Sequence, residues 1–472
     1  MKKVISTVLV FLILFSFSAC DKADEYIEYK NSAVTVYPVP EGAKKSSHYK
    51  CTVSGQDVEL YGLGDDAYGI LRFGSSADVT IDSDHVVNEV TVYPQNKVKK
   101  LSLKNSVIDF TVSKSGSYVV NLDDKSRIFL FFDEQIDKGA LSEGGYFKQG
   151  VNKTNTKIEK SVLNSDKGVL NLKSDTEYYM EYGSVLDGKI VGDNVSNVRI
   201  IGGGSVTGGI TLTGCDNIDV KSLTFTSSAD ISHCSNVRFE NVKVIADTDA
   251  LTFSSCTGSS FDGGFVKSTG DSVSIKNEPV TYDKDNLTDI DIEFDKSENI
   301  TVSNCVIDSL EGNSLQIGRQ TIGDSISNIT FKDITVAENI NGVALAINNF
   351  NNSDINKINF ENIEIENAEP KSESNFLIDI KNMYSLEYSD AYASTPIGNI
   401  DNINFKNVNM LGGKKDIGIS FCGYKETREQ YPALIHKVNN IYFKDCNILD
   451  VKVTRSYYYM YVGSHVESLN FE

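Results

Sequence analysis

The segment Asn197-Val-Arg-Ile200 places an asparagine at a bend and follows it with alternating apolar and polar residues. The pattern returns down to the C-terminus in Asn217–Val220, Asn236–Phe239, Ser259–Asp262, Asn299–Val302, Asn328–Phe331, Lys357–Phe360, Asn402–Phe405, Asn440–Phe443 and Ser468–Phe471. These segments lie about 20 to 45 residues apart, which is typical of solenoids with one repeat per turn. Because one turn cannot bury its own apolar face, stacked turns must supply the core. The sequence therefore predicts a parallel β-helix over residues 136–472, with corner asparagines hydrogen-bonded between turns.

Cysteines recur with a period close to that of these segments. Cys215, Cys234 and Cys256 each come just before a strand, and Cys305 and Cys446 occupy comparable places in later turns. The sequence contains no close pair of the CxxC type that zinc sites use, and its five histidines show no metal-binding spacing. We therefore expect the thiols to point inward and pack as small apolar groups, and we expect no metal site and no cofactor.

The region before residue 136 lacks the repeat. Between residues 31 and 135, short runs rich in Val, Ile, Tyr and Phe are divided by Gly, Asp, Ser and Pro, as in Val34-Thr-Val-Tyr-Pro38 and Ile128-Phe-Leu-Phe-Phe132. Such runs are typical of strands in a sandwich. The sequence thus predicts an all-β protein in which a small β-sandwich domain precedes the β-helix. Insertions at 278–297 and 366–400 are expected as surface loops that would carry substrate specificity.

The first residues predict where the protein is located. Lys2 and Lys3 precede an apolar run from Val4 to Phe17, and small residues then lead to Cys20. This order is typical of a bacterial lipoprotein signal with its lipobox. A transmembrane anchor is the alternative, but the run is short for a span. We expect residues 1–19 to be a signal peptide, Cys20 to be acylated, and residues 20–30 to form a tether to the membrane, in the periplasm or at the cell surface.

Acidic residues outnumber basic ones by 65 to 45, which gives a formal net charge of −20. Loss of Lys2 and Lys3 with a signal peptide would leave about 22 net negative charges. Such a field repels nucleic acid and gives no help in collecting a polyanion. A neutral partner is favoured, no nucleic acid is expected to bind, and we expect a monomer.

Acidic corners recur in the middle of the chain. Asp247-Thr248-Asp249, Gly270-Asp271-Ser272 and Gly312-Asn313-Ser314 sit at similar places in successive repeats, so stacking brings them to one face. Hydrolysis of a glycosidic bond by inversion needs one protonated carboxyl and one ionised carboxylate facing each other. The residues Asp249 and Asp271 are candidates for these roles, with Asp247 as a third carboxylate. The alternative is that all three are corner aspartates that cap turns.

Residues 168–365 resemble the pectin-lyase-type right-handed β-helix of polygalacturonase-like glycoside hydrolases, family 28 and its dextranase-like relatives of family 49. The resemblance rests on Leu172–Leu186, on Ile201-Gly-Gly-Gly-Ser-Val-Thr-Gly-Gly209, and on Gly312-Asn-Ser-Leu-Gln-Ile-Gly318 followed by Ile326–Phe331. The N-terminal region, with Tyr37-Pro-Val-Pro-Glu-Gly-Ala43 and Leu130-Phe-Phe132, is similar to the domain preceding the β-helix in the dextranase-like group.

The resemblance implies an active site with departures from the family pattern. An Asn-Thr-Asp triplet of the family corresponds to Asp247–Asp249, and its paired Asp-Asp corresponds without gaps to Gly270-Asp271. The proton donor position then holds glycine, whereas a shift of one residue would make Asp271 the donor. Asn313 stands where the family has histidine, and Lys276 is expected near the site as a substrate-binding residue beside Asn313.

Two further departures concern the substrate. Ala344 and Ala346 replace the arginine and lysine that bind uronate in the family, so galacturonan is an unfavourable substrate. The main hypothesis is a surface glycoside hydrolase that inverts bonds of a neutral polysaccharide. The alternative is a catalytically inactive β-helix that binds glycan or acts as an adhesin. A polysaccharide lyase is a weaker option, because neither a calcium cluster nor a basic residue for proton abstraction is visible in the sequence.

Overall fold

The computed structural model describes residues 33–123, 125–134, 145–147, 150–153, 163–164, 168–278, 295–319, 321–350, 353–371, 375–383, 398–426 and 434–472. These residues form strands, turns and one short 3₁₀ helix, η1 (Gln95–Lys97). They include no helix long and apolar enough to cross a membrane. Cys20 and the predicted signal peptide lie outside the described residues.

The N-terminal region consists of two sheets packed face to face around one apolar core. One sheet has the order β1-β5-β11-β10-β7 with β4 on β5: β1 (Val34–Val36), β4 (Tyr61–Leu63), β5 (Asp66–Phe73), β7 (Val90–Tyr93), β10 (Gly116–Leu122) and β11 (Ser126–Asp133). The other has the order β3-β2-β6-β9-β8: β2 (Tyr49–Val53), β3 (Gln56–Val58), β6 (Ala77–Ser83), β8 (Val98–Lys104) and β9 (Val107–Val112). All pairings are antiparallel except that of β5 with β11. This arrangement is the predicted β-sandwich.

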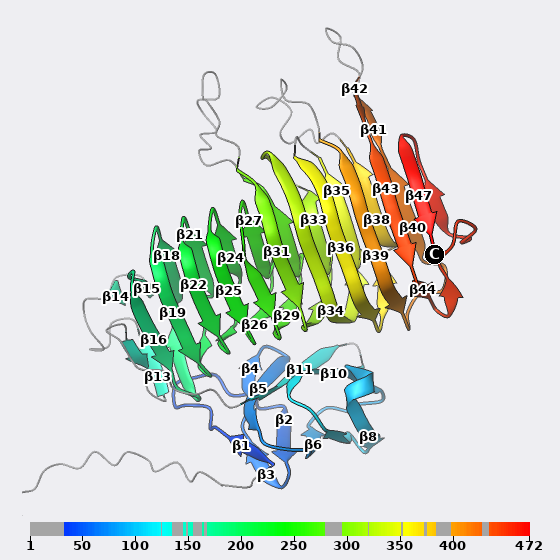
Figure 1. The fold of residues 1–472 in the computed structure, drawn as a ribbon. Coiled ribbons are helices and arrows are strands. Elements are labelled where there is room, and N and C mark those ends of the chain that lie inside the picture. The colour runs from blue at the N-terminus through cyan, green and yellow to red at the C-terminus, as the bar shows by residue number, and fades with distance from the viewer. Residues whose placement is uncertain are drawn as a thin grey trace, which may run out of the picture.

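The rest of the described chain coils into a parallel β-helix with three faces (Figure 1). Face one contains β12 (Gly145–Phe147), β16 (Thr176–Met180), β19 (Ser196–Gly202), β22 (Asp216–Lys221), β25 (Ser235–Glu240), β28 (Ser260–Asp262), β31 (Ser297–Ser303), the first part of β34 (Ser325–Asn341), β36 (Asp354–Ile365), β39 (Ile400–Met410), β43 (Val438–Lys444) and β47 (Val466–Phe471). Face two contains β13 (Gly150–Lys153), β17 (Ser184–Asp187), β20 (Ser205–Val206), β23 (Thr224–Phe225), β26 (Lys243–Ile245), β29 (Phe265–Ser268), β32 (Val306–Ser309), the end of β34, β37 (Ala368–Pro370), β44 (Asn447–Ile448) and β45 (Val451–Lys452).

Face three is a separate 12-stranded sheet, and the candidate site lies on it. Its strands are β14 (Leu163–Asn164), β15 (Val169–Asn171), β18 (Lys189–Asp193), β21 (Ile210–Thr213), β24 (Ala229–Ser232), β27 (Leu251–Ser254), β30 (Val273–Lys276), β33 (Leu315–Arg319), β35 (Leu345–Asn349), β38 (Phe376–Asn382), β40 (Gly418–Cys422) and β46 (Met460–Val462). A small hairpin of β41 (Tyr424–Glu426) and β42 (Leu434–His436) follows β40. The predicted fold class is confirmed. The insertion predicted at 366–400 is not simply a loop, because the turn still needs β37 and β38 to continue the stack.

The corner asparagines have the predicted role. Asn197 and Asn217 adopt positive φ angles of 57° and 54°, a left-handed conformation that asparagine tolerates better than most residues. The side-chain amide of Asn217 donates to the Oδ1 atom of Asn197 at 2.9 Å, and Asn197 donates in turn to Asp175 at 2.8 Å. The asparagine at each bend therefore turns the chain and also links one turn to the next.

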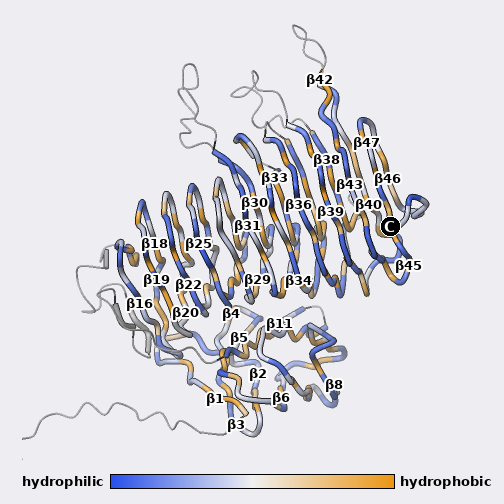
Figure 2. Tube along the Cα trace, in the orientation of Figure 1, coloured by the Kyte–Doolittle hydropathy of each residue, from blue (hydrophilic) through white to orange (hydrophobic). Residues whose placement is uncertain are grey.

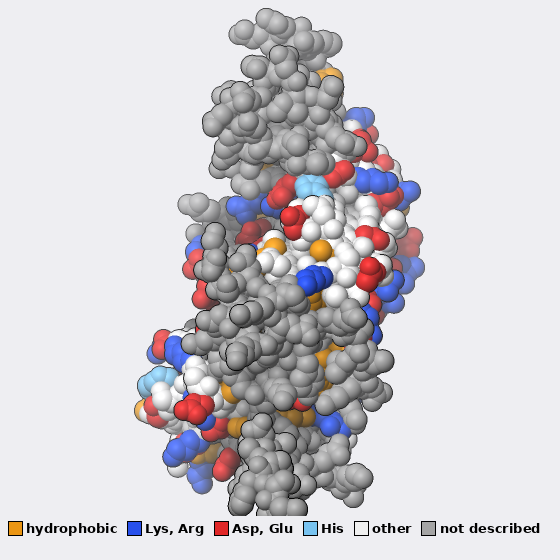
Figure 3. Space-filling view, turned by 90° about the vertical axis from the view of Figure 1, so that its left-hand side faces the viewer, with side chains coloured by type: hydrophobic (Ala, Val, Ile, Leu, Met, Phe, Trp, Pro, Cys, Tyr) orange, Lys and Arg blue, Asp and Glu red, His pale blue; other side chains and the backbone are white. Residues whose placement is uncertain are grey.

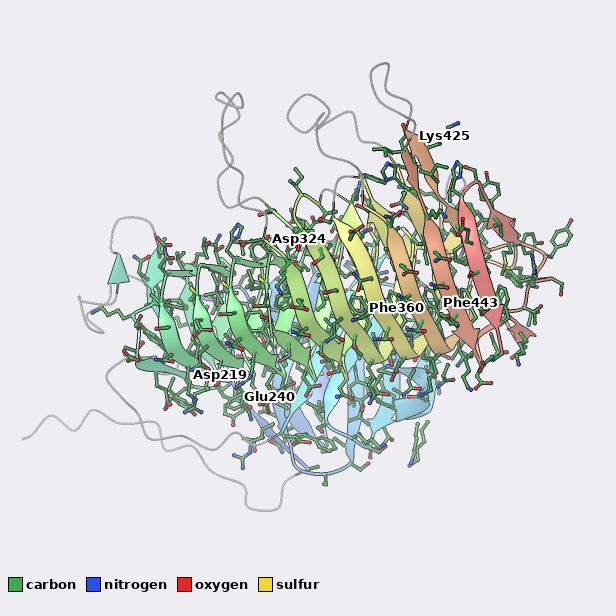
Figure 4. All side chains as sticks on the ribbon, turned by 45° about the horizontal axis from the view of Figure 1, so that its top comes forward. Asp219, Glu240, Asp324, Phe360, Lys425 and Phe443 are labelled. Carbon is green, nitrogen blue, oxygen red and sulfur yellow. The ribbon has the colours of Figure 1, made fainter. Side chains whose placement is uncertain are left out.

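Alternation along each strand separates core from surface (Figure 2). The predicted inward thiols are confirmed, because Cys215, Cys234 and Cys256 are at most 2% exposed and unpaired. Farther along, rings of successive turns stack in one column with centroid distances from 4.7 to 5.4 Å, formed by Phe331, Phe360, Phe405, Phe443 and Phe471. Figure 4 labels two members of this column, Phe360 and Phe443. These contacts make the stacked turns a single continuous core.

The sandwich packs against face two of the β-helix, below the solenoid in Figure 1. An apolar cluster joins Tyr68, Phe129 and Phe131 of the sandwich to Ile245 and Phe265 of the solenoid. Face two is thus covered by protein, and face three is left on the opposite side.

Buried charges cross the same interface. Lys243 is completely buried and its Nζ atom lies 2.5 Å from Oδ1 of Asp133. Arg127 lies between two buried carboxylates, with Nη2 2.5 Å from Oε2 of Glu338 and Nε 3.2 Å from Oδ2 of Asp308. Partnered charges of this kind fix the sandwich at one place on the solenoid.

Candidate active site

The floor of the site is formed by face three. Strands β24, β27 and β30 pair in parallel, so that Asp230 lies beside Thr252 and Ser254 lies beside Lys276. Residues at the alternate positions point into the core, among them the fully buried Phe253. Since side chains alternate across a strand, the outward positions form polar columns along the solenoid.

The wall of the site is the corner that leads from face two into face three. Together the floor and wall enclose an open groove of about 740 Å³. The carboxylates that line it are those of Asp230, Asp247, Asp249, Glu278 and Glu311, and the one cation among its described lining residues is Lys276. On later turns the outward positions close over, because Gln316, Ala346 and Asp379 are at most 4% exposed. The groove is therefore limited to the turns that contain the predicted site residues and to the corner at Glu311.

A ladder of side chains runs along this corner. The backbone N–H of Asp271 donates to Oδ1 of Asp249 at 2.8 Å, and the N–H of Asn313 donates to Oδ1 of Asp271 at 2.8 Å. The next step repeats the pattern, with Val343 donating to Oδ1 of Asn313 at 2.9 Å. Asp249, Asp271 and Asn313 thus occupy equivalent positions of adjacent turns. One carboxylate oxygen of Asp249 and one of Asp271 therefore accept a backbone N–H of the next turn, so these two aspartates link turns at the corner.

The two leading candidates differ in their surroundings. Asp249 is exposed and lines the groove. Asp271 is 6% exposed and is not among the residues that line the groove. Burial raises the pKa of Asp271 and the nearby charge of Asp249 raises it further, while the Asn313 N–H and Arg319 act in the opposite direction. The guanidinium of Arg319 lies 3.6 Å from Oδ2 of Asp271.

Gly270 has no room for a side chain, although the resemblance predicts a proton donor at this position. A Cβ atom there would lie 2.3 Å from Oδ1 of Asp249 and 2.7 Å from the backbone nitrogen of the same residue. Gly312 stacks on Gly270 from the next turn, and its own Cβ would lie 2.1 Å from the carbonyl carbon of Gly270. The glycines are therefore required by close packing between turns.

The remaining predicted residues divide between groove and ladder. Asp247 has a 94% exposed side chain whose Oδ1 lies 2.9 Å from the buried Nζ of Lys267. Lys276 lines the groove and is paired with Glu278 at 2.8 Å. Asn313 does not line the groove, and its amide nitrogen donates to Gln316 at 2.6 Å.

The groove also contains a carboxylate that the sequence analysis missed. Glu311 directly precedes Gly312 and lines the groove together with Asp249 and Gly270. No ion pair of Glu311 is found among the described residues. The alignment of the corners in successive turns could have identified it. Gly312 packs on Gly270 of the preceding turn, and this places Glu311 at the edge of the groove.

The two positions where the resemblance predicts uronate-binding cations hold buried alanines. Ala344 and Ala346 are at most 1% exposed, and Ala346 lies between Gln316 and Asp379 of the neighbouring strands. The described side chains on the face shown in Figure 3 mix acidic and basic groups rather than forming one basic patch. Nothing at these two positions can pair with a uronate carboxylate.

Neither a protein-family model nor a curated protein sequence matches the chain. Among solved structures, Dex49A from Penicillium minioluteum is similar over 90% of this chain and 92% of its own, with a TM-score of 0.53 and 13% identity. The polygalacturonase from Erwinia carotovora matches 71% of this chain and 98% of its own, with a TM-score of 0.45 and 13% identity. An exopolygalacturonase from Thermotoga maritima matches 69% and 83%, with a TM-score of 0.44 and 12% identity.

The three structures named above are parallel β-helix glycoside hydrolases, as the sequence resemblance predicted. At this level of identity the similarity establishes the fold. The chain has the parallel β-helix, preceded by a β-sandwich, that was predicted from its sequence.

Proposed function

We propose that the groove binds a polysaccharide and that a glycosidic bond is hydrolysed at its corner wall. The observation that carries this proposal is the unequal pair at that corner: Asp249 is exposed in the groove, and Asp271, one turn away, is buried with a raised pKa. Two carboxyl groups whose surroundings drive their protonation apart are what acid–base hydrolysis requires.

Asp249 has the position of the general base. Its Oδ1 atom is held by the N–H of Asp271, which orients the carboxylate toward the groove where a water molecule can be activated. Removal of a proton from that water generates the nucleophile, and a protonated carboxyl must deliver a proton to the departing oxygen.

Two carboxyl groups are candidates for the donor. Asp271 occupies the equivalent position one turn away, a spacing of about 4.8 Å between strands, which is close to the separation of about 5 Å found in retaining enzymes. In that case Asp249 would attack the sugar as nucleophile while Asp271 protonates the departing oxygen, and water would then hydrolyse the covalent intermediate. Glu311 lies two turns from Asp249, about 10 Å along the solenoid, nearer to the separation of about 6.5–9.5 Å found in inverting enzymes. Inversion therefore favours Glu311, whereas the raised pKa favours Asp271.

A neutral substrate fits the charges of the groove. Five carboxylates line it, and the cation of its described lining, Lys276, is paired with Glu278. A polyuronate would be repelled, and the buried Ala344 and Ala346 offer it no cation. Hydroxyl groups of a neutral sugar can donate to the exposed carboxylates and to the serines and threonines of the floor.

The test is incubation of the full chain with a panel of neutral polysaccharides and with galacturonan, followed by measurement of new reducing ends. We expect cleavage of a neutral polymer and none of galacturonan. The anomeric configuration of the first product, read by NMR, distinguishes the two donors: inversion supports Glu311 and retention supports Asp271. Cleavage that is unchanged in Asp249→Asn would refute the placement of the active site.

Glycan binding without turnover is the second candidate. It is favoured by Gly270, because a Cβ atom at the donor position of the family would lie 2.3 Å from Asp249. In that case, affinity electrophoresis would show retardation by a polysaccharide that is not degraded, and Asp230→Ala in the groove floor would weaken the retardation.

Attachment to a membrane through Cys20 is part of the same proposal. Support comes from the sequence alone, in which an apolar run and small residues directly precede Cys20. Acylation would keep the groove near the cell envelope, in the periplasm or on the surface. Cys20→Ala should release the protein from membranes or leave an unprocessed precursor, and unchanged membrane partition of that variant would contradict the proposal.

A further inference from the structure

A second cluster of chemically active side chains lies on the sandwich, far along the chain from the groove residues. His48, Asp84 and His85 each offer one ligand atom, and these atoms all lie within 4.8 Å of one another. Nδ1 of His48 is 3.2 Å from Oδ2 of Asp84, and Nε2 of His85 is 3.4 Å from Oδ1 of Asp84. The two imidazole rings are stacked, with centroids 4.9 Å apart.

The backbone fixes this arrangement. β2 and β6 pair with Tyr49 opposite Ser83, so the residues just outside that pair, His48 and Asp84, also face each other. The N–H of Asp84 donates to the carbonyl of His48 at 3.0 Å, and the N–H of His85 donates to the hydroxyl of Ser83 at 3.2 Å. The side chains therefore project from the end of a paired strand and not from an unsupported loop.

The distances suit a small transition-metal ion. Zinc binds imidazole nitrogen at about 2.0–2.1 Å and carboxylate oxygen at about 2.0–2.2 Å, so tetrahedral ligand atoms lie about 3.3–3.5 Å apart. The separations of 3.2 Å and 3.4 Å that Asp84 makes with His48 and with His85 are close to this size, and they involve the two different oxygens of its carboxylate. Two imidazoles and one carboxylate suit Zn²⁺, Cu²⁺, Ni²⁺ or Fe²⁺, whereas Ca²⁺ and Mg²⁺ prefer sets made of oxygen.

We propose that His48, Asp84 and His85 form a binding site for a divalent transition metal, with Zn²⁺ as the representative ion. Three protein ligands leave a fourth position for water or an outside oxygen. His85 also lines a cavity of about 350 Å³ together with Tyr49 and Asp123, which gives that position access to solvent. Because His48 and His85 lie far apart in the sequence, only the pairing of β2 with β6 brings them together.

The test is calorimetric titration of the full, EDTA-treated chain with ZnCl₂ at pH 7.5. We expect one site of micromolar affinity, weakened about tenfold or more in His85→Ala and in His48→Ala, since each removes one of three ligands. Circular dichroism of each variant would check that the sandwich is folded.

A matched control is available in His233. Its Nδ1 lies 2.7 Å from Oδ2 of Asp295, so it is a histidine–carboxylate pair without a second histidine. His233→Ala should leave zinc affinity unchanged. Absence of zinc binding in the native chain, or binding that His85→Ala and His48→Ala do not weaken, would overturn the proposal and leave the cluster as a surface hydrogen-bonded group.

Discussion

The groove on face three and the interface on face two both contain several carboxylates. The carboxylates of the two regions differ in their exposure to solvent. In the groove, Asp247 and Asp249 are exposed. At the interface, Asp308 and Glu338 are at most 1% exposed around Arg127. Burial raises the pKa of Asp308 to about 7, even though the charge of Arg127 lowers it. The large displacement of a carboxyl pKa here marks the covered interface between two domains.

A strongly shifted carboxyl pKa does not by itself identify an active site. Perturbed groups are often taken as signs of an active site, yet structural ion-pair networks produce them as well. The sandwich excludes water from face two, so its charges are stabilised by partners that span two domains. The groove is recognised by its shape, its access and its lining, and the raised pKa of Asp271 counts there only together with the exposed Asp249 one turn away.

The largest expected effect concerns the groove. Asp249→Asn should lower turnover of a polysaccharide that the native protein cleaves by about 10³-fold, because the amide cannot accept a proton from water. Its Oδ1 can still accept the N–H of Asp271, so the fold should persist. Initial rates of reducing-end formation provide the measurement. Asp219→Asn, at a charged position on face one, is the matched control and should leave the rate unchanged.

Arg127→Ala tests the buried charge network at the interface between the sandwich and the β-helix. The change leaves Asp308 and Glu338 buried without their cation, so we expect the free energy of unfolding to fall by about 3–5 kcal/mol. Arg238→Ala removes an exposed ion pair with Asp219 at 3.7 Å and should cost less than about 1 kcal/mol. Urea unfolding followed by fluorescence gives both values. Equal losses of unfolding free energy in the two variants would show that the buried network stabilises the protein no more than an exposed ion pair does.

Gly270→Ala tests the packing of the corner. The new Cβ would press on Oδ1 and the backbone nitrogen of Asp249, so we expect a loss of about 1–3 kcal/mol in unfolding free energy. The displaced Asp249 should also lower any turnover. Gly55→Ala is a useful comparison, because no atom lies within 4 Å of the place its new methyl group would take and its cost comes from the positive φ angle of 78° alone. A stable Gly270→Ala variant with full function would show that the corner can relax.

Much of the fold could be predicted because its signals are local and repeated. Asn197, Asn217 and their equivalents mark the bends, and the apolar residues after them recur with the turn. Cys215 and Cys234 could be assigned to the core from their spacing alone. The prediction of a surface loop at 366–400 is only partly correct, because β37 and β38 belong to the stack.

Less of the site could be predicted, because it depends on register between turns. The family pattern identified Asp249, Asp271 and the glycine at 270. It could not show that Asp271 is buried beside Arg319 or that Glu311 reaches the groove. The buried charge network at the interface could not be predicted from the sequence, because Arg127 and Glu338 belong to different domains and no local pattern connects them.

The smallest expected effect concerns pH at the edge of the interface, where both carboxylate oxygens of Glu366 accept the N–H of Gln95 at 3.0 Å. Burial raises the pKa of Glu366 to about 7, from an ordinary value of 4.5. The folded state therefore holds this proton more tightly than the unfolded state. The resulting stabilisation is complete below about pH 4.5 and is lost as the pH rises through about 7. Glutamine cannot ionise, so Glu366→Gln should match the native protein at pH 5 and exceed its unfolding free energy at pH 8 by about 1–2 kcal/mol. Glu369→Gln, at an exposed position three residues on, should show no such dependence. A difference between Glu366→Gln and the native protein that stays constant from pH 5 to 8 would mean that Glu366 is ionised throughout, and that the sandwich admits water at this edge.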